Sequence, residues 1–202
     1  MASSSYSDGK ALVDRFVSVI NAQPNKSTFY TAAPPSVQVG ECRDEKFCGW
    51  CIKPYSGTSW VKATELALSI RLPGIRLPGL YRSLVTRYIF PAFSAGGIRL
   101  WANTPEGTAN GEFRCSHIGF APLAYDLLTK GYLQFGNPET GDFDPICFDL
   151  NSVGSTIDCP ILRFEHEFFD VNELMPKAWI YGSFREFLET VISGTSFPSA
   201  LL

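Results

Sequence analysis

Apolar residues recur at helical spacing near both ends of the chain. In residues 8–21 and again in residues 184–192 they return every three or four positions, a pattern typical of an amphipathic helix with one buried face. The positions are Leu12, Val13, Phe16, Val17 and Ile20 in the first segment, and Phe184, Phe187, Leu188, Val191 and Ile192 in the second. Ser183 and Glu186 have the spacing of a capping box, and Gly194 follows the last periodic residue, so the second helix carries signals for both of its ends.

A third helix is expected from about Leu80 to Tyr88, and residues 61–70 are also compatible with a helix. A tandem repeat precedes it, in which Ile-Arg-Leu-Pro-Gly occurs at residues 70–74 and again at 75–79. Two copies of five residues are too few for a solenoid, which stacks several larger units. We interpret the repeat as a local duplication in the turn that leads into the helix.

Beyond residue 97 the apolar period changes from helical spacing to two, which indicates strands. The alternating positions are Ile98, Leu100 and Ala102; Leu133 and Phe135, with Gly136-Asn137-Pro138 expected to end that strand; Ile146, Phe148 and Leu150; and Leu162, Phe164, His166 and Phe168. The last two segments are the strongest strand signals, and each has one apolar and one polar face, so the pattern predicts an antiparallel sheet that is covered on one face only. His166 is in phase with two phenylalanines, so we expect it to be packed within its strand.

Strands flanked by helices without regular β-α-β alternation predict an α+β fold, with a central, mostly antiparallel sheet and packed helices. The length of 202 residues suits one domain of this kind. We therefore assign residues 61–202 to the domain. Residues 1–60 are expected to form an N-terminal helix followed by an irregular extension that contains cysteine and proline.

Composition narrows the class of protein. A hydrophobic fraction of 45% with 18% charged residues excludes an intrinsically disordered chain. The formal net charge of -3 argues against a general nucleic-acid binder, which has a basic binding domain. The first residues lack the apolar segment of a secretory signal, and no run approaches the ~18 apolar residues of a membrane span. These features predict a cytoplasmic protein with no membrane partner.

The cysteines offer one candidate metal site. Cys48 and Cys51 form a single CxxC with Cys42 shortly before it, and Cys115 with His117 is the second pair that could complete four zinc ligands. Reduced, scattered thiols are the favoured interpretation in a cytosolic protein, so neither a metal nor a cofactor is predicted. A zinc-binding protein or a hydrolase is the less favoured alternative. The sequence contains no GxSxG, GxxxxGK[ST] or GxGxxG motif, and we predict that the protein is not an enzyme.

Charge is distributed unevenly along the chain. From Glu139 to Glu173 there are nine acidic residues and one basic residue, Arg163, whereas Lys53 to Arg99 holds seven basic residues and one acidic. One interpretation is that these segments pair with each other or are simply solvated. The other is an acidic face that attracts and holds a basic protein partner. The candidate partner-binding residues are Asp142, Asp144, Asp149, Asp158, Glu165, Glu167 and Asp170.

Five short motifs, in order along residues 66–192, resemble those of the SUKH superfamily. This superfamily includes the Smi/Knr type of cell-wall-assembly regulator and many bacterial toxin-immunity proteins. The matching stretches are Leu77-Pro78 with Tyr81-Arg82, residues 98–103 (IRLWAN), residues 141–150 (GDFDPICFDL), residues 159–167 (CPILRFEHE) and residues 183–188 (SFREFL). The tandem IRLPG repeat is an insertion relative to the family pattern, and residues 90–94 (FPAFS) replace its usual acidic, glycine-containing turn.

The resemblance implies an α+β fold and a binding role without catalysis. It implies an immunity protein that neutralises a cognate toxin by direct contact in the cytosol. A nuclease toxin would suit an acidic partner, because its active surface must be basic to bind phosphates. The alternative within the superfamily is a regulatory or scaffold protein of the cell-wall-regulator type.

Overall fold

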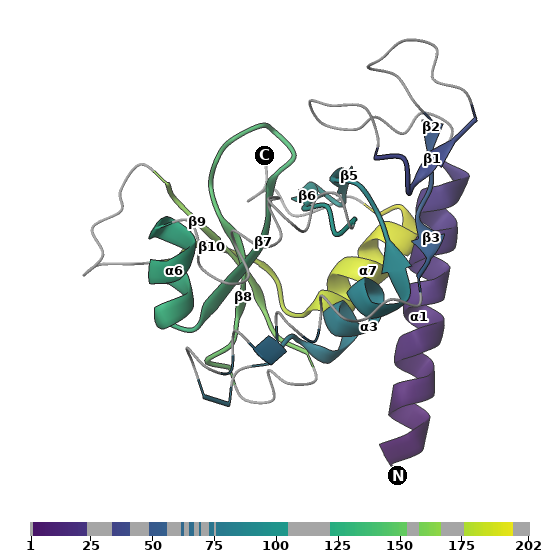
Figure 1. Cartoon of the computed structure of the whole chain (residues 1–202). Coiled ribbons are helices and arrows are strands. Elements are labelled where there is room, and N and C mark those ends of the chain that lie inside the picture. The colour runs from purple at the N-terminus through teal and green to yellow at the C-terminus, as the bar shows by residue number, and fades with distance from the viewer. Residues whose placement is uncertain are drawn as a thin grey trace.

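A six-stranded antiparallel sheet forms the centre of the fold (Figure 1). The computed structural model describes residues 2–23, 34–40, 49–55, 62, 65–66, 69, 73–74, 76–104, 122–152, 158–166 and 176–195. Within these residues the helices are α1 (Ala2–Ala22), α3 (Gly79–Arg87), α6 (Pro122–Thr129) and α7 (Phe184–Ser193). The strands are β1 (Gln38–Val39), β2 (Gly49–Trp50), β3 (Lys53–Pro54), β4 (Tyr88–Ile89), β5 (Phe93–Ala95), β6 (Ile98–Leu100), β7 (Tyr132–Pro138), β8 (Ile146–Asp149), β9 (Ile161–Phe164) and β10 (Pro176–Tyr181).

The order of strands across the large sheet is the order along the chain, from β5 at one edge to β10 at the other. Every pairing is antiparallel, and two small sheets, β1–β2 and β3–β4, lie outside it. The expected α+β fold with an antiparallel sheet and an N-terminal helix is therefore confirmed. None of the helices in the described part of the chain is both long and apolar enough to cross a membrane.

The main core lies between the sheet and the helices α1, α3 and α7 (Figure 1). Aromatic rings dominate it: Phe135 of β7 stacks on Phe148 of β8 with ring centroids 4.0 Å apart, and Tyr81 of α3 lies 5.0 Å from the latter ring. On the other side of this core, Phe16 of α1 contacts the ring of Phe187 of α7. Helix α1 thus packs on α3 and α7 and shares one core with the sheet.

The expectation that only one face of the sheet is covered is wrong. Helix α6 lies over the other face, where Leu127 packs against Cys147, Leu162 and Phe164 (Figure 1). Leu162 and Phe164 of β9 face α6, whereas Ile161 and Arg163 lie on the face toward the main core, so all four residues of β9 are buried. Alternation of apolar and polar residues predicted a solvated face here, but the polar side chain is buried because it has charged partners, described below.

Strand β7 also differs from the sequence-based expectation, because it continues through Gly136 and Asn137 to Pro138. Gly136 does not end the strand; it marks a close approach of two backbones. A Cβ atom at this position would lie 2.4 Å from the carbonyl oxygen of Arg99 on β6, and the register with β8 shifts here. Glycine in a strand interior often marks such a bulge.

The helical expectations agree with the structure more closely. The first helix was predicted at residues 8–21 and observed at 2–22, and the third was predicted at about 80–88 and observed at 79–87. At the start of α7 the Ser183 hydroxyl accepts the backbone N–H of Glu186, whose carboxylate accepts the N–H of Gly182. Gly194 ends the helix in the left-handed conformation, with φ of 66°. The Ser183 cap and the glycine end are confirmed, while the return bond from Glu186 reaches Gly182, one residue before the Ser183 expected for a capping box.

Candidate protein-interaction site

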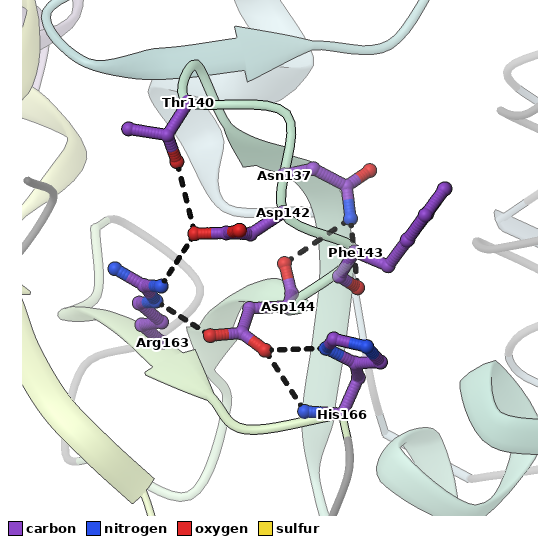
Figure 2. A network of polar contacts seen from close by, with 7 residues as sticks. All are labelled: Asn137, Thr140, Asp142, Phe143, Asp144, Arg163 and His166. Carbon is purple, nitrogen blue, oxygen red and sulfur yellow. Dashed lines mark hydrogen bonds and ion pairs between the residues drawn. The ribbon is translucent and has the colours of Figure 1, made fainter.

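A buried ion pair joins the turn before β8 to strand β9. Arg163 Nε donates to Asp144 Oδ2 at 2.8 Å, and the two side chains are only 8% and 4% exposed. The second carboxylate oxygen, Oδ1, accepts the backbone N–H of His166 at 2.9 Å and lies 2.8 Å from His166 Nδ1 (Figure 2). Because a carboxylate only accepts hydrogen bonds, Nδ1 of His166 must carry its hydrogen. Asp144 therefore fixes the turn to the end of β9.

The protonation of Asp144 follows from these contacts. Burial alone raises the pKa of a carboxyl group, but the hydrogen bonds from the His166 ring and backbone and from Arg163, together with the charge of that guanidinium, outweigh it and lower the pKa of Asp144 to about 2. The group is therefore a carboxylate at neutral pH, and the network is a charged one.

Asn137, near the end of β7, binds the backbone of the turn between β7 and β8. Its Nδ2 donates to the carbonyl oxygens of Phe143 and Asp144 at 3.2 and 3.1 Å, and its Oδ1 accepts the indole N–H of Trp101 at 2.8 Å. The asparagine thus ties the loop to the last residues of β7 and to the chain after β6. The loop backbone at Phe143 and Asp144 has little freedom to move independently of the sheet.

Asp142 extends the network to the surface (Figure 2). Its Oδ2 accepts from Arg163 Nη2 at 3.1 Å and from the Thr140 hydroxyl at 3.0 Å, while the side chain remains 52% exposed. Together with the exposed Glu139, it places negative charge on the outside of a turn whose base is rigid. An exposed charge on a pre-ordered loop is suited to contact with a macromolecular partner, because little conformational entropy is lost on binding.

The structure divides the candidate acidic residues between two ends of the sheet. β8 and β9 are antiparallel, with Ile146 opposite Arg163 and Phe148 opposite Ile161. Asp142, Asp144 and Glu165 therefore lie at one end of these strands, and Asp149 and Asp158 at the other. The two groups are separated by about 15 Å along the strands. Glu167 and Asp170 lie outside the described residues.

The carboxylates at the far end bind the backbone of this chain. Asp158 accepts the N–H groups of Phe184 and Arg185 at 2.8 and 3.1 Å, so it caps the first turn of α7 in addition to Ser183. Asp149 accepts the N–H of Asn151 at 3.0 Å in the turn after β8. Glu165, directly after β9, is half-buried. Of the candidate residues that the structure describes, Asp142 is the one that is exposed.

Replacing Asp158 by Ala is expected to lower the free energy of unfolding by about 1–2 kcal/mol, because two amides of the first turn of α7 lose their acceptor. Urea unfolding followed by circular dichroism measures this. Asp158→Asn keeps one carbonyl acceptor and is the matched control, with a smaller expected loss. A change below about 0.5 kcal/mol in Asp158→Ala, the range of ordinary surface substitutions, would contradict the capping role.

His166 is not packed in an apolar strand face as predicted. Strand β9 ends at Phe164, and the imidazole is half-buried beside the Asp144 carboxylate. The physical reason is that Asp144 binds both the backbone and the ring of this residue, which turns the chain away from the sheet. Phe168, the last residue of the predicted alternation, lies outside the described residues.

The two buried thiols, Cys147 and Cys159, are poorly suited to nucleophilic chemistry. Burial raises the pKa of Cys147, and burial with nearby Asp158 and Asp149 raises that of Cys159, which keeps both as thiols at neutral pH. Among the residues that the structure describes, no group of three histidine, cysteine or acidic side chains could hold a metal ion. Cys42, Cys48, Cys115 and His117, which the zinc alternative requires, lie outside them.

Sequence reasoning did not identify Arg163, Asn137 or Phe143 as parts of this site. Arg163 had a usable signal, since it is the one basic residue in a strongly acidic segment and stands among apolar strand residues. Such a residue needs a carboxylate partner if it is buried. Asn137 and Phe143 gave no comparable signal. Comparison of the sequence with known families finds no family that matches, and no curated protein matches it.

Proposed function

We propose that this chain is a non-enzymatic protein-binding domain of the SUKH type. It acts as a cytoplasmic immunity protein that neutralises a basic toxin domain by direct contact. The observation that carries this proposal is the β7–β8 turn, which exposes Glu139 and Asp142 on a base fixed by Asp144, Arg163 and His166 (Figure 2).

The placement of the SUKH-like motifs supports the proposal. They fall in order at the start of α3, on and just after β6, on the turn and strand β8, on β9, and at the start of α7. Two of them, residues 141–150 and 159–167, contain both partners of the buried Asp144–Arg163 pair. The stretches that carry the resemblance thus also build the rigid base of the turn.

The experiment is co-expression with the products of genes adjacent to the one that encodes this chain. An immunity protein is expected to restore the growth of cells that express a toxic neighbour, and to form a complex with it in gel filtration. Restored growth without a complex, or catalytic turnover of any substrate by this chain, would contradict the proposal. A gene with no toxic neighbour would favour a regulator or scaffold instead.

Changing the charge of the turn is expected to slow association with that toxin. In the double variant Glu139→Lys with Asp142→Asn, the association rate at low salt should fall by about tenfold, and its dependence on salt should flatten, because exposed charges act mainly on the rate of encounter. Stopped-flow fluorescence at several salt concentrations measures both quantities.

The matched control is Asp8→Asn with Glu189→Lys, which changes the net charge equally at exposed positions of α1 and α7. It should leave the association rate within about twofold of the original protein. Equal slowing by both double variants would mean that total charge, and not this turn, attracts the partner.

A further inference from the structure

The side chain of Phe143 is unusually exposed for this protein. Among the described large hydrophobic residues it is the most exposed, at 75%, followed by Leu66 and Trp179 at 62%. The other described phenylalanines, by contrast, are at most 1% exposed; they are Phe16, Phe90, Phe93, Phe135, Phe148, Phe164, Phe184 and Phe187. Burying an exposed phenyl ring is favourable, so a partner with an apolar pocket would bind more tightly through it.

The backbone that carries Phe143 is already fixed in the free protein. Its carbonyl oxygen accepts from Asn137, and the next residue, Asp144, is buried and bound to Arg163 and His166. The phenyl ring meets the His166 imidazole edge-on, with ring centroids 6.0 Å apart. In Figure 2 the ring points away from Arg163 and the Asp142 carboxylate. An aromatic side chain on a pre-ordered backbone loses little entropy on binding, which is the property of an interface anchor.

The charges around Phe143 specify the partner. Exposed Glu139 and Asp142 lie on the same turn, and the half-buried Glu165 follows β9 at the same end of the sheet. The nearby guanidinium of Arg163 is turned inward and contacts Asp144 and Asp142. A complementary surface therefore has an apolar pocket bordered by lysine or arginine side chains. The same charges disfavour a second copy of this chain, because two acidic turns would face each other across the interface.

We infer that Phe143 is the anchor of the binding surface and inserts into an apolar pocket with a basic rim on the protein partner. This inference rests on the proposed protein-binding function and deepens it. The phenyl ring provides most of the affinity for the partner, and the neighbouring carboxylates increase the rate at which the two proteins associate. Truncating the ring is then expected to accelerate dissociation, whereas changing the charges slows association.

The test begins with the full chain carrying the photocrosslinker p-benzoylphenylalanine at position 143, expressed in the cells that natively produce the protein. Position 179 carries the same group as the control, because Trp179 is also exposed but lies on β10, across β9 from β8. The crosslinked protein is identified by mass spectrometry and purified. Its affinity is then measured by calorimetry for the original chain, Phe143→Ala, Phe143→Leu and Trp179→Ala.

Phe143→Ala is expected to weaken binding by about 30-fold or more, through faster dissociation and with an unchanged salt dependence, which is the effect of losing an anchor of about 2 kcal/mol. The affinity of Phe143→Leu should lie between that of the original chain and that of Phe143→Ala. The affinity of Trp179→Ala should stay within about twofold of the original. Thermal unfolding should be unchanged in Phe143→Ala, because the ring is mostly in water.

Three results would overturn the inference: no protein crosslinked from position 143, crosslinks to a second copy of this chain alone, or an affinity that Phe143→Ala changes by less than threefold. These are separable from failure of the proposed function. If Phe143→Ala binds normally and the Glu139→Lys with Asp142→Asn variant associates slowly, the proposed function is supported and the anchor role of Phe143 is wrong. If Phe143→Ala weakens binding but this chain does not suppress the toxicity of the crosslinked partner, the anchor role of Phe143 is supported and the immunity function is wrong.

Discussion

Replacing Arg163 by Met is expected to lower the free energy of unfolding by about 3 kcal/mol, because it leaves the buried Asp144 carboxylate without its guanidinium partner. The bonds from His166 remain, which places the loss at the lower end of the range for broken buried pairs. Urea unfolding at pH 7 measures the change. The control is Arg185→Ala, since Arg185 forms an exposed pair with Glu189 at 3.6 Å and should contribute less than about 1 kcal/mol.

Acid unfolding gives a second readout of the same pair. The folded-state pKa of Asp144, about 2, lies below the ~3.9 of an unstructured aspartate. Its contribution to stability is therefore complete above pH ~4 and is lost as the pH falls toward 2. In Arg163→Met, the free energy of unfolding should fall less steeply between pH ~4 and 2 than in the original protein. Adding Asp144→Asn to Arg163→Met should recover part of the stability at pH 7. A double variant less stable than the single one would contradict the uncompensated charge as the cause.

Replacing Phe16 by Ala is expected to cost about 4 kcal/mol in the free energy of unfolding, because it opens a cavity where α1 meets the rest of the core. Phe16 is fully buried, and its ring lies 6.4 Å from that of Phe93 on β5 and 6.0 Å from that of Phe187 on α7. Unfolding should remain a single transition, observed alike by circular dichroism and by tryptophan fluorescence.

Ser18→Ala, at an exposed position on the same helix, is the control and should change stability by less than about 0.5 kcal/mol. If Phe16→Ala costs less than about 1 kcal/mol, or if helical signal is lost before the fluorescence changes, α1 unfolds independently of the sheet. Either result would separate the first helix from the cooperative unit.

Local signals were sufficient to predict much of the fold. Helices α1, α3 and α7 follow from apolar spacing, and the ends of α7 from Ser183, Glu186 and Gly194, because these effects act within one or two turns of the chain. The coverage of the sheet by α6 was not predicted. It depends on contacts between Leu127 and strand residues more than 15 positions away in the sequence, and such contacts leave no periodic signal.

The candidate site was predicted only in part, because counting acidic residues along a segment ignores strand register. Asp142 lies on an exposed turn. Asp158 instead accepts hydrogen bonds from the first amides of α7, and Asp144 forms a buried ion pair with Arg163. Which end of the sheet a carboxylate occupies is fixed by the pairing of β8 with β9. That pairing could not be derived from the apolar pattern, which fixes the faces of a strand but not its partner.

The packing of α1 has a consequence for synthesis on the ribosome. Helix α1 is translated before the sheet, but it packs against α7, which is translated after the sheet. Helix α3 is available earlier, but the part of the apolar stripe that packs against α7, including Phe16, stays exposed while the intervening sheet is translated. Neighbouring strands can pair in the order in which they emerge, since each lies next to its predecessor. Until α7 has been translated, this part of α1 remains exposed apolar surface, which makes the nascent chain prone to aggregation.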